Sequence, residues 1–468
     1  MSRINTNIAS LQAMSRLGKN QNELATRLQR LSSGLKINTG KDAPAGLIAS
    51  ETLRSEINGI NQAIDNSTRA TNVINTAEGA LNEVSSLLLE VQSLTNEAAN
   101  NGALSQEEIK ANQLQVDAIF ASINRIANTT QFNGVKLLNG ALDYTASGVA
   151  STAVDVATIN AVKLPDNGYT TVTVEVTASA LTGQVDFTGA TVGTSAVTIE
   201  VGGNDGAEQL SFAANTATSA VAFAVNQLKG ATGVSALVNG GTLEFHSVGF
   251  GSDQFVSVKT INGAFTNGKG TGQDAGVNIN GSRADVKGLV ASVRSGDFDV
   301  SLTLDKNFAQ NVSTTGTSFN VVGGGAKFQI GSQVNRQGQI NVGITSVSTT
   351  KLGDEVQGFL SSVGSGGVNS LVSGNTIQAQ KILSTAIRQV ATLRGRLGAL
   401  QKDVLNTNVN SLQTALENVT ASESAIRDAD FADETSKLTR AQILVQANTS
   451  VLAQANSAPQ AVLNLLGR

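Results

Sequence analysis

The sequence predicts a mainly α-helical protein with a β-rich insert: both chain ends form a long antiparallel helix bundle or coiled-coil rod, and the middle forms a central β-rich outer domain. The first observation is the distribution of glycine. Nine of the 47 glycines lie before Ala141, three lie after Gly374, and the other 35 lie between. The second is that apolar residues recur every three or four positions towards both ends, the spacing of one helix face. The third is that apolar and polar residues alternate in the middle, the period of a strand.

Composition limits the function classes. The 468 residues are 40% hydrophobic but only 4% aromatic, with no tryptophan and no cysteine, so the core must be built from Leu, Ile, Val and Ala. A formal net charge of -4 gives no broad basic field, which argues against nucleic-acid binding. We expect no cleaved signal peptide, because the first residues contain only short apolar stretches, and no membrane span, because no run of 18 apolar residues occurs.

The two extreme ends carry weak heptads. Heptad spacing joins Met14, Leu17, Leu24, Leu28, Leu31 and Leu35, and it also joins Val445 to Leu452 and Leu444 to Val451. Gln21 falls in the first seam, and the residues between are mostly Asn, Gln, Ser, Thr and Ala. Such seams hold weakly alone, so we expect both ends to be largely disordered in the free monomer and to order when many copies pack together.

A long helix is predicted from Pro44 to about Asn100. Its face comprises Ile57, Ile60, Ile64, Thr71, Ile74, Leu81, Val84, Leu88 and Val91. Pro44 suits the first helical turn, and Asp42 is expected to cap the free amides there. At 1.5 Å per residue the helix would be roughly 80 Å long, which favours a rod over a compact domain.

Further helical and hairpin signals flank this rod. Ser105 and Glu108 form a capping box before an apolar helical run, so a second helix should fold back on the first. "TTQFNGVKLLNG" contains Asn-Gly twice around a short apolar run, which predicts a hairpin. Near the other end, a heptad seam joins Leu405, Val409, Leu412, Leu416, Val419 and Ile426.

The middle of the chain is predicted to be β-rich. Stretches such as "TTVTVEVT", "SAVTIEVGG" and "FDVSLTLD" alternate apolar and polar residues between Gly, Asn and Asp turns. Only "TSAVAFAVNQLKG" has helical spacing, so we expect one small helix within 151–325. "KFQIGSQVNRQGQINVGI" is predicted to be a hairpin that returns the chain to the rod.

Four stretches resemble a known family. "MSRINTNIASLQA", "LQRLSSGLKINTGKDAPAGL", "TQFNGVKLLNG" and "RAQILVQANTSVLAQANSAPQAVLNLLGR" are similar to bacterial flagellin, the filament subunit of the flagellum. The resemblance covers roughly the first 140 and last 95 residues. It implies a structural protein, with no enzyme activity and no cofactor, that polymerises head-to-tail into an extracellular filament used for swimming.

The resemblance also implies a division into three domains. Residues 1–43 and 430–468 would form a terminal coiled-coil inner core, disordered in the monomer. Residues 44–150 and 326–429 would form a helical rod with β-hairpins, and 151–325 a variable surface-exposed domain. The implied assembly residues of the inner core are Ile4, Ile8, Leu11, Leu17, Leu24, Leu28, Leu31, Leu444, Val445, Val451, Leu452, Leu463 and Leu466.

"SSGLKINTGKDAPAGL" resembles the spoke that links the inner core to the rod in flagellins. Its implied spoke and inter-subunit residues are Gly34, Lys36, Gly40, Lys41, Asp42, Pro44 and Gly46. The three glycines would allow the backbone turns, and Lys36, Lys41 and Asp42 would contact neighbouring subunits. An ordinary solvated loop between helices is the alternative for each charge.

The resemblance implies a set of partners: the flagellar cap and hook-associated proteins, a type III export apparatus, and an export chaperone that masks the carboxyl-terminal apolar residues. Flagellins detected by the animal Toll-like flagellin receptor carry an arginine, a leucine four residues later, and a glutamate on the next helix. This chain keeps Leu94 but has Glu90 at the arginine position and Gln115 at the glutamate position. The reversed charge predicts weak or absent receptor activation.

Other functions remain as weaker alternatives. "GLKINTGKD" resembles a phosphate-binding loop but has the wrong glycine spacing and no Ser or Thr at Asp42. "RDADFADE" suggests a metal site, although a helix cap is favoured. A zinc protease in the insert would need paired histidines, and His246 is the one histidine in the chain. A hook-filament junction protein of the same family is the nearest alternative.

Overall fold

The computed structural model describes residues 6–100, 102–165, 168–295, 298–355 and 357–466, without the side chains of 313–315 and 458–466. These residues form two compact units. The first contains the chain up to Thr68, Gln329–Gly338 and the chain from Val404 onwards. The second contains Arg69–Phe328 and Gln339–Asp403.

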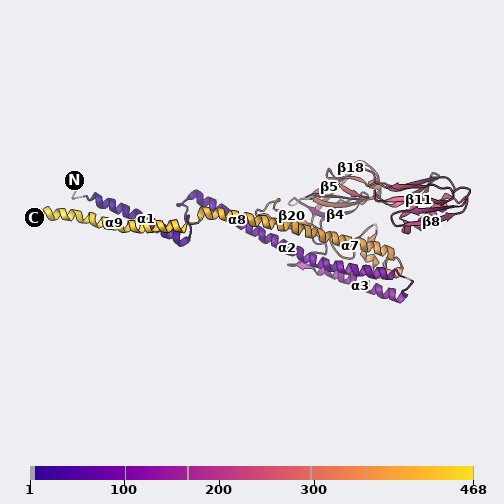
Figure 1. Ribbon diagram of the computed structural model, residues 1–468, viewed down its shortest axis with the longest axis horizontal. Coiled ribbons are helices and arrows are strands. Elements are labelled where there is room, and N and C mark those ends of the chain that lie inside the picture. The colour runs from indigo at the N-terminus through magenta and orange to yellow at the C-terminus, as the bar shows by residue number, and fades with distance from the viewer. Residues whose placement is uncertain (1–5, 101, 166–167, 296–297, 356, 467–468) are drawn as a thin grey trace. The chain divides into compact units, whose positions relative to one another are not determined.

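The helices occupy mainly the two ends of the chain, as the sequence predicts (Figure 1). They are α1 (Ile8–Ser33), α2 (Pro44–Ala98), α3 (Gln106–Thr129), α4 (Thr218–Gln227), α5 (Lys229–Thr232), α6 (Lys306–Gln310), α7 (Thr376–Ala399), α8 (Thr407–Arg427) and α9 (Phe431–Leu466). Short 3-10 helices lie at η1 (Leu360–Val363) and η2 (Leu371–Ser373), and a π-helical stretch, η3 (Leu400–Asn406), joins α7 to α8.

Local sequence signals explain where two of these helices begin. Pro44 starts α2, because its fixed φ suits the first turn and its missing N–H costs no hydrogen bond there. Ser105 accepts from the Glu108 amide, and the Glu108 side chain accepts from the Ser105 amide, so the predicted capping box before α3 is confirmed.

In the second unit, the part of α2 beyond Thr68 packs with α3 and α7 around an apolar core (Figure 1). Its fully buried large residues include Leu81, Val84, Leu88, Val91, Val116, Ile123, Ile382 and Leu383. An ion pair of 2.8 Å between Arg394 Nε and Glu78 Oε1 joins α7 to α2. Alanines at 63, 70 and 77 are also buried in α2, whereas Ile57, Ile64 and Thr71 of the predicted face are only half-buried.

The strands divide into two larger groups. The first group is β3 (Thr145–Ser147), β4 (Val154–Val162), β5 (Thr170–Ala178), β13 (Gly276–Ile279), β14 (Ser282–Arg283), β15 (Asp285–Lys287), β16 (Val290–Ser295), β17 (Phe298–Leu304) and β18 (Ser313–Gly323). They form antiparallel sheets of order β14-β13-β5-β18-β3 and β15-β16-β17-β4. A core that includes Val174, Val300, Leu302 and Phe319 lies among them.

The second group is β6 (Thr182–Thr188), β7 (Val197–Gly202), β8 (Ala207–Phe212), β9 (Val234–Asn239), β10 (Thr242–Phe250), β11 (Phe255–Asn262) and β12 (Gly268–Thr271). These strands form sheets of order β6-β10-β9 and β12-β11-β7-β8. Their core contains Ile199, Phe245 and Val225, the last from α4. The β-rich middle is therefore confirmed. The prediction of one small helix there was wrong, because the short helix α5 follows α4 directly and another, α6, lies between β17 and β18.

Three small hairpins complete the fold. They are β1 (Gln131–Phe132) with β2 (Val135–Lys136), β19 (Ala326–Gln329) with β20 (Gln339–Val342), and β21 (Gly353–Asp354) with β22 (Gly358–Phe359). Asn133 and Gly134 both have positive φ between β1 and β2, which confirms the Asn-Gly turn. The predicted hairpin after the insert is also confirmed. Within the described residues, no helix combines the length and apolarity needed to cross a membrane.

Candidate functional site

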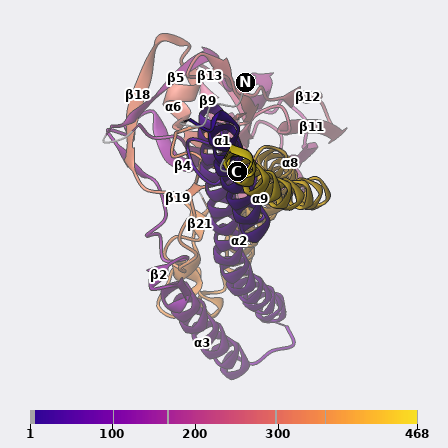
Figure 2. The ribbon, with the colours of Figure 1, turned by 90° about the vertical axis from the view of Figure 1, so that its left-hand side faces the viewer.

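Helices α1 and α9 run antiparallel and pack against each other (Figures 1 and 2). We call them the terminal pair. Hydrogen bonds of 2.7 to 3.1 Å join Asn7 to Ala455, Ser10 to Asn456, Arg27 to Glu434, Lys36 to Arg427 and Gly34 to Ala429. From Asn7–Ala455 through Arg27–Glu434 to Lys36–Arg427, the first partner moves forward along the chain as the second moves back by a similar amount. The terminal pair therefore has one antiparallel register from end to end.

The facing residues of the terminal pair form a heptad seam. On α1 the seam comprises Ser10, Ala13, Leu17, Asn20, Leu24, Arg27 and Leu31, and on α9 it comprises Glu434, Leu438, Ala441, Val445, Asn448, Leu452 and Ala455. Each set alternates steps of three and four residues, as in a coiled coil. Only Ala13, Glu434 and Ala441 of these are fully buried, and the others are half-buried.

The structure corrects the predicted seam of α1. Met14 and Leu28 are 61% and 48% exposed, and Gln21 is exposed as well, so none of the three faces α9. Leu17, Leu24 and Leu31 lie in the seam as predicted, but the positions between them lie one residue earlier, at Ala13, Asn20 and Arg27. Sequence reasoning followed the large leucines and so missed a seam that contains small and charged residues.

The predicted assembly residues fall into two sets. Leu17, Leu24, Leu31, Val445 and Leu452 lie in the seam. Ile8, Leu11, Leu28, Leu444 and Val451 are between 40% and 58% exposed and form what we call the outer apolar set. Ile4 lies outside the described residues, and Leu463 and Leu466 belong to α9 but their side chains lie outside the described ones.

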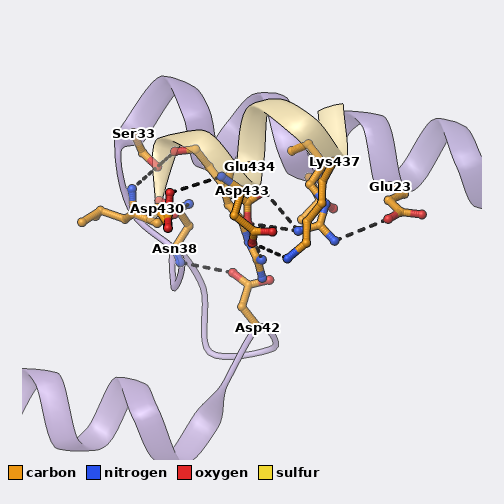
Figure 3. A network of polar contacts seen from close by, with 12 residues as sticks. Glu23, Ser33, Asn38, Asp42, Asp430, Asp433, Glu434 and Lys437 are labelled. Carbon is orange, nitrogen blue, oxygen red and sulfur yellow. Dashed lines mark hydrogen bonds and ion pairs between the residues drawn. The ribbon is translucent and has the colours of Figure 1, made fainter. Parts of the chain in front are cut away.

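A buried ion triad joins the terminal pair near the end of α1 (Figure 3). Glu434, only 4% exposed, accepts two hydrogen bonds from Arg27 Nη1, at 3.0 and 3.1 Å, and one from Arg30 Nη1 at 3.2 Å. Burial alone would lower the pKa of the Arg27 guanidinium, but its hydrogen bonds and charge pairing with Glu434 and Glu23 raise it above its ordinary value. The raised pKa keeps the Arg27 guanidinium charged where it contacts Glu434.

The spoke segment, residues 34–46, begins at a left-handed residue. Gly34 has φ 73° and donates its N–H to Arg30 O, which ends α1 with a glycine cap. The Gly34 carbonyl then accepts from the Ala429 amide at 2.9 Å, and the Lys36 amide donates to Arg427 O at 2.7 Å. These bonds tie the spoke segment to the end of α8 and the start of α9.

Asp42 does not cap α2, contrary to the prediction. Its carboxylate turns back towards the loop and accepts from the backbone amides of Asn38 and Thr39 and from the Thr39 hydroxyl, at 3.2, 2.8 and 2.8 Å (Figure 3). The Thr39 hydrogen bonds lower the pKa of Asp42, with smaller help from Asn38 and the Arg30 charge. Asp42 therefore holds the spoke loop together instead of starting the helix.

The remaining predicted spoke residues are two glycines and two lysines, and the structure defines a role for only some of them. Gly40 lies in a turn, but neither Gly40 nor Gly46 has positive φ, so neither position needs glycine for a left-handed backbone. Gly46 is needed for packing, because a Cβ there would lie 2.7 Å from Cδ1 of buried Ile37. Lys36 and Lys41 are exposed, and their contacts with neighbouring subunits stay a prediction.

The acidic run "RDADFADE" builds a helix start, as favoured from the sequence. Asp430 accepts from the amides of Ala432 and Asp433 at the first turn of α9. Among the described residues, no group of three or more His, Asp or Glu side chains could hold a metal ion. His246 on β10 is partly buried, and it contacts Thr182 and Glu244 at 3.0 and 3.1 Å.

The residues that correspond to the receptor motif are not all accessible. Glu90 on α2 and Gln115 on α3 are exposed, but Leu94 is only 9% exposed. The accessible part of this surface is therefore formed by the two positions that depart from the family motif.

Arg27, Arg30 and Glu434 were not selected as site residues from the sequence. The signal that would have found them is a pair of opposite charges at the seam positions of two heptads. That signal can be recognised only when the two heptads are aligned antiparallel in the correct register, and the register is known only from the structure.

Comparison with known proteins gives a consistent result. Residues 4–143 match the family described as bacterial flagellin N-terminal helical region, and residues 380–466 match its C-terminal counterpart. Flagellin of Salmonella typhimurium and B-type flagellin of Pseudomonas aeruginosa are each 31% identical to this chain, with 99% of each chain covered. Among solved structures, a flagellar hook associated protein-3 from Legionella pneumophila is 13% identical with a TM-score of 0.27, covering 83% of this chain and 99% of that one.

Proposed function

The chain belongs to the bacterial flagellin family, and from this premise we propose that the terminal pair drives its polymerisation. Flagellins are structural subunits of the extracellular flagellar filament used for motility and are not enzymes, and this chain is such a subunit. The alternative of a hook-filament junction protein is not better supported. What remains to be assigned is which surfaces of this chain perform the assembly.

The outer apolar set is the observation that supports the proposal. After α1 and α9 have paired, Ile8, Leu11, Leu28, Leu444 and Val451 still expose about half of their surface. Exposed apolar residues concentrated on one helix pair are typical of an interaction surface. A contact between two different faces of successive copies does not close into a ring and so generates a helical filament.

We also propose the three-domain division given above. Residues 1–43 and 430–468 would form the inner core, 44–150 and 326–429 the rod, and 151–325 the outward-facing domain. The division agrees with the change from helices to sheets, although β3 starts at Thr145 and pairs with β18 inside the first β group. The exposed side chains of the spoke residues Lys36 and Lys41, which form no ion pair with the described residues, would contact neighbouring subunits.

Electron microscopy of the purified chain tests the polymerisation proposal. The full chain, mixed with short filament seeds or ammonium sulfate, should form long tubes. A version limited to residues 44–429 should form none and yet unfold cooperatively on heating. Tubes from the shortened version would overturn the role given to the terminal pair.

Export is the second part of the proposal. We expect a flagellar type III channel to carry the chain without removal of a signal peptide, and an export chaperone to cover the carboxyl-terminal apolar residues, including Leu444, Val445, Val451 and Leu452. Amino-terminal sequencing of the secreted chain should return the encoded start. Chaperone binding should be lost when the residues after Asp433 are deleted, and unchanged binding would count against the chaperone site.

The exposed Glu90 and Gln115 support weak or absent activation of the animal Toll-like flagellin receptor. A receptor that expects an arginine would have to bury an unmatched carboxylate beside Glu90. The variant Glu90→Arg with Gln115→Glu should activate receptor-expressing cells at lower protein concentration than the unmodified chain. Full potency of the unmodified chain would refute this part of the proposal.

A further inference from the structure

The apolar residues of the terminal pair do not by themselves determine its register. Counting back along α1 from Arg27 and forward along α9 from Glu434 sets Leu24 opposite Leu438 and Leu17 opposite Val445. The same count sets the next large residue, Leu452, opposite the small polar Ser10, whose hydroxyl donates to Asn456 one turn further along α9. The observed register thus makes two layers of paired large apolar residues in this part of the seam.

A shift of one heptad would make an equally good or better apolar seam. In that register Leu17 would meet Leu452, Leu24 would meet Val445 and Leu31 would meet Leu438. The smaller seam residues would also match, because Ala13 would meet Ala455 and Asn20 would meet Asn448. Burial of apolar area favours the shifted register as much as the observed one, so another interaction must exclude it.

The ion triad is the interaction that distinguishes the two registers. After the shift, Arg27 would face Ala441, and Glu434 would lose the guanidinium groups of both Arg27 and Arg30. By the same count, Glu434 would lie opposite Gly34, past the last residue of α1, while Arg27 would stay in the seam with no carboxylate to pair with, which is unfavourable. The backbone bonds of Gly34 and Lys36 also break in the shifted register, but they lie at half-buried or exposed positions where water can replace them.

We propose that Glu434, held by Arg27 and Arg30, specifies the register of α1 on α9. The inference rests on the proposed role of the terminal pair in polymerisation. A shift of one heptad would displace the α1 members of the outer apolar set by about 10 Å relative to the α9 members, at 1.5 Å per residue. Only the observed register then presents the outer apolar set in the arrangement that neighbouring copies bind.

The absence of cysteine from the chain makes the register directly measurable. The pair Leu17→Cys with Val445→Cys reports the observed register, and the pair Leu24→Cys with Val445→Cys reports the shifted one. In the observed register the second pair is separated by one heptad, about 10 Å along the helix axis, whereas a disulfide needs Cα atoms within about 7 Å. Each pair is introduced with native Glu434 and with Glu434→Gln.

The cysteine variants are polymerised from seeds with a large excess of unmodified chain, so that the unmodified chain builds the filament. Filaments are then oxidised and dissolved, and intramolecular cross-links are separated on a non-reducing gel. With native Glu434, the first pair should cross-link and the second should not. With Glu434→Gln, the ratio of shifted to observed cross-link should rise about tenfold, the factor that corresponds to about 1.4 kcal/mol.

Two further variants separate charge pairing from general loss of structure. The reversed triad, Arg27→Glu with Arg30→Glu and Glu434→Arg, should restore the cross-link pattern of the native triad. Glu23→Gln is the matched control, because Glu23 also contacts Arg27, at 3.4 Å, but its side chain is 47% exposed. It should leave the pattern unchanged.

The outcomes are distinct. An unchanged cross-link pattern in Glu434→Gln chains that enter the filament would overturn the register proposal while leaving the proposed function intact. If Glu434→Gln chains do not enter, incorporation of the reversed triad supports the proposal, and its exclusion overturns it. Failure of the unmodified chain to form filaments would instead count against the proposed function.

Discussion

The two helical regions of this chain bury their residues very differently. Where α2, α3 and α7 pack, Leu81, Leu88, Ile123 and Leu383 are fully buried. In the terminal pair the buried apolar residues are the small Ala13 and Ala441, and the large ones are half-buried or exposed. Helix length does not predict this difference, because α9 spans 36 residues and α3 only 24.

The difference indicates where each region obtains its stability. A fully buried leucine contributes about 2 to 3 kcal/mol through removal of apolar surface from water. In the α2–α3–α7 bundle, several leucines of one chain are buried in this way and stabilise the fold of the free chain. The terminal pair leaves much of its apolar surface in water, and helices without buried faces are marginal. That the ends are disordered in the free monomer therefore stays a prediction, now with a physical reason.

Leucine-to-alanine variants should show the largest difference between the two regions. Leu88→Ala removes a fully buried side chain, and we expect the free energy of unfolding of the free chain to fall by about 3 kcal/mol. Leu24→Ala, in the half-buried seam, should leave thermal unfolding of the free chain unchanged and slow seeded polymerisation. Calorimetry of the free chain and light scattering during polymerisation measure the two effects.

The opposite outcome is easily recognised. If Leu24→Ala lowered the unfolding temperature of the free chain as much as Leu88→Ala, the terminal pair would already be packed before assembly. The distinction between a self-sufficient bundle and an assembly-dependent pair would then be wrong.

A second prediction concerns a polar contact in the unit that contains the bundle. Arg396 of α7 donates to the Asn160 side chain on β4 and, at 2.6 Å, to Gly343 O. Burial lowers the pKa of Arg396, while the charges of Asp299 and Asp143 oppose that effect. Arg396→Gln should lower the free energy of unfolding by about 2 kcal/mol, because it leaves buried acceptors unpaired.

The exposed Arg388 on the same helix provides the control for this measurement. Arg388→Gln should change urea unfolding by less than about 0.5 kcal/mol. If Arg388→Gln lowered the free energy of unfolding as much as Arg396→Gln, the loss would not be specific to the contact between α7 and β4.

The sequence predicted the helices, the capping box, the hairpins and the β-rich middle because these depend on local periodicity and turn chemistry. It misplaced the α1 seam because the large leucines outweighed Ala13 and Arg27 in the pattern. It misassigned Asp42 because a carboxylate before a proline-initiated helix resembles a cap, whereas the side chain bonds backwards to Thr39. It missed Glu434 because the residue that pairs with it, Arg27, lies 407 positions earlier in the chain.

Two glycine substitutions should give effects of opposite sign. Gly34 has φ 73°, so Gly34→Ala places a Cβ in the left-handed region and should destabilise the end of α1 by about 1 kcal/mol. Gly79 lies inside α2 with open space at its Cβ, so Gly79→Ala should stabilise the bundle by about 0.5 to 1 kcal/mol. Gly34→Ala should slow polymerisation, and Gly79→Ala should raise the unfolding temperature of the free chain.

If Gly34→Ala instead altered the unfolding of the free chain and left polymerisation unaffected, the spoke segment would belong energetically to the bundle. That result would move the boundary between the two regions past the end of α1.

The smallest expected effect is a pH dependence at one carboxylate in each region. Hydrogen bonds from Thr39 lower the pKa of Asp42, and hydrogen bonds from Ser105 lower that of Glu108. A carboxylate whose pKa is depressed by folding stabilises the fold above its unfolded pKa, about 4, and this contribution is lost as the pH falls through the folded value. Amide exchange protection of Thr39 and Ser105 should therefore decline together below about pH 4.

The two declines should have different consequences. Loss of the Asp42 contacts loosens the loop between α1 and α2, so the rate of seeded polymerisation should fall in the same acidic range. Asp42→Asn should polymerise slowly at neutral pH and lose most of this pH dependence, whereas Glu108→Gln should behave like the unmodified chain. If Glu108→Gln instead removed the pH dependence of the polymerisation rate, the acid sensitivity of assembly would originate in the bundle and not in the spoke segment.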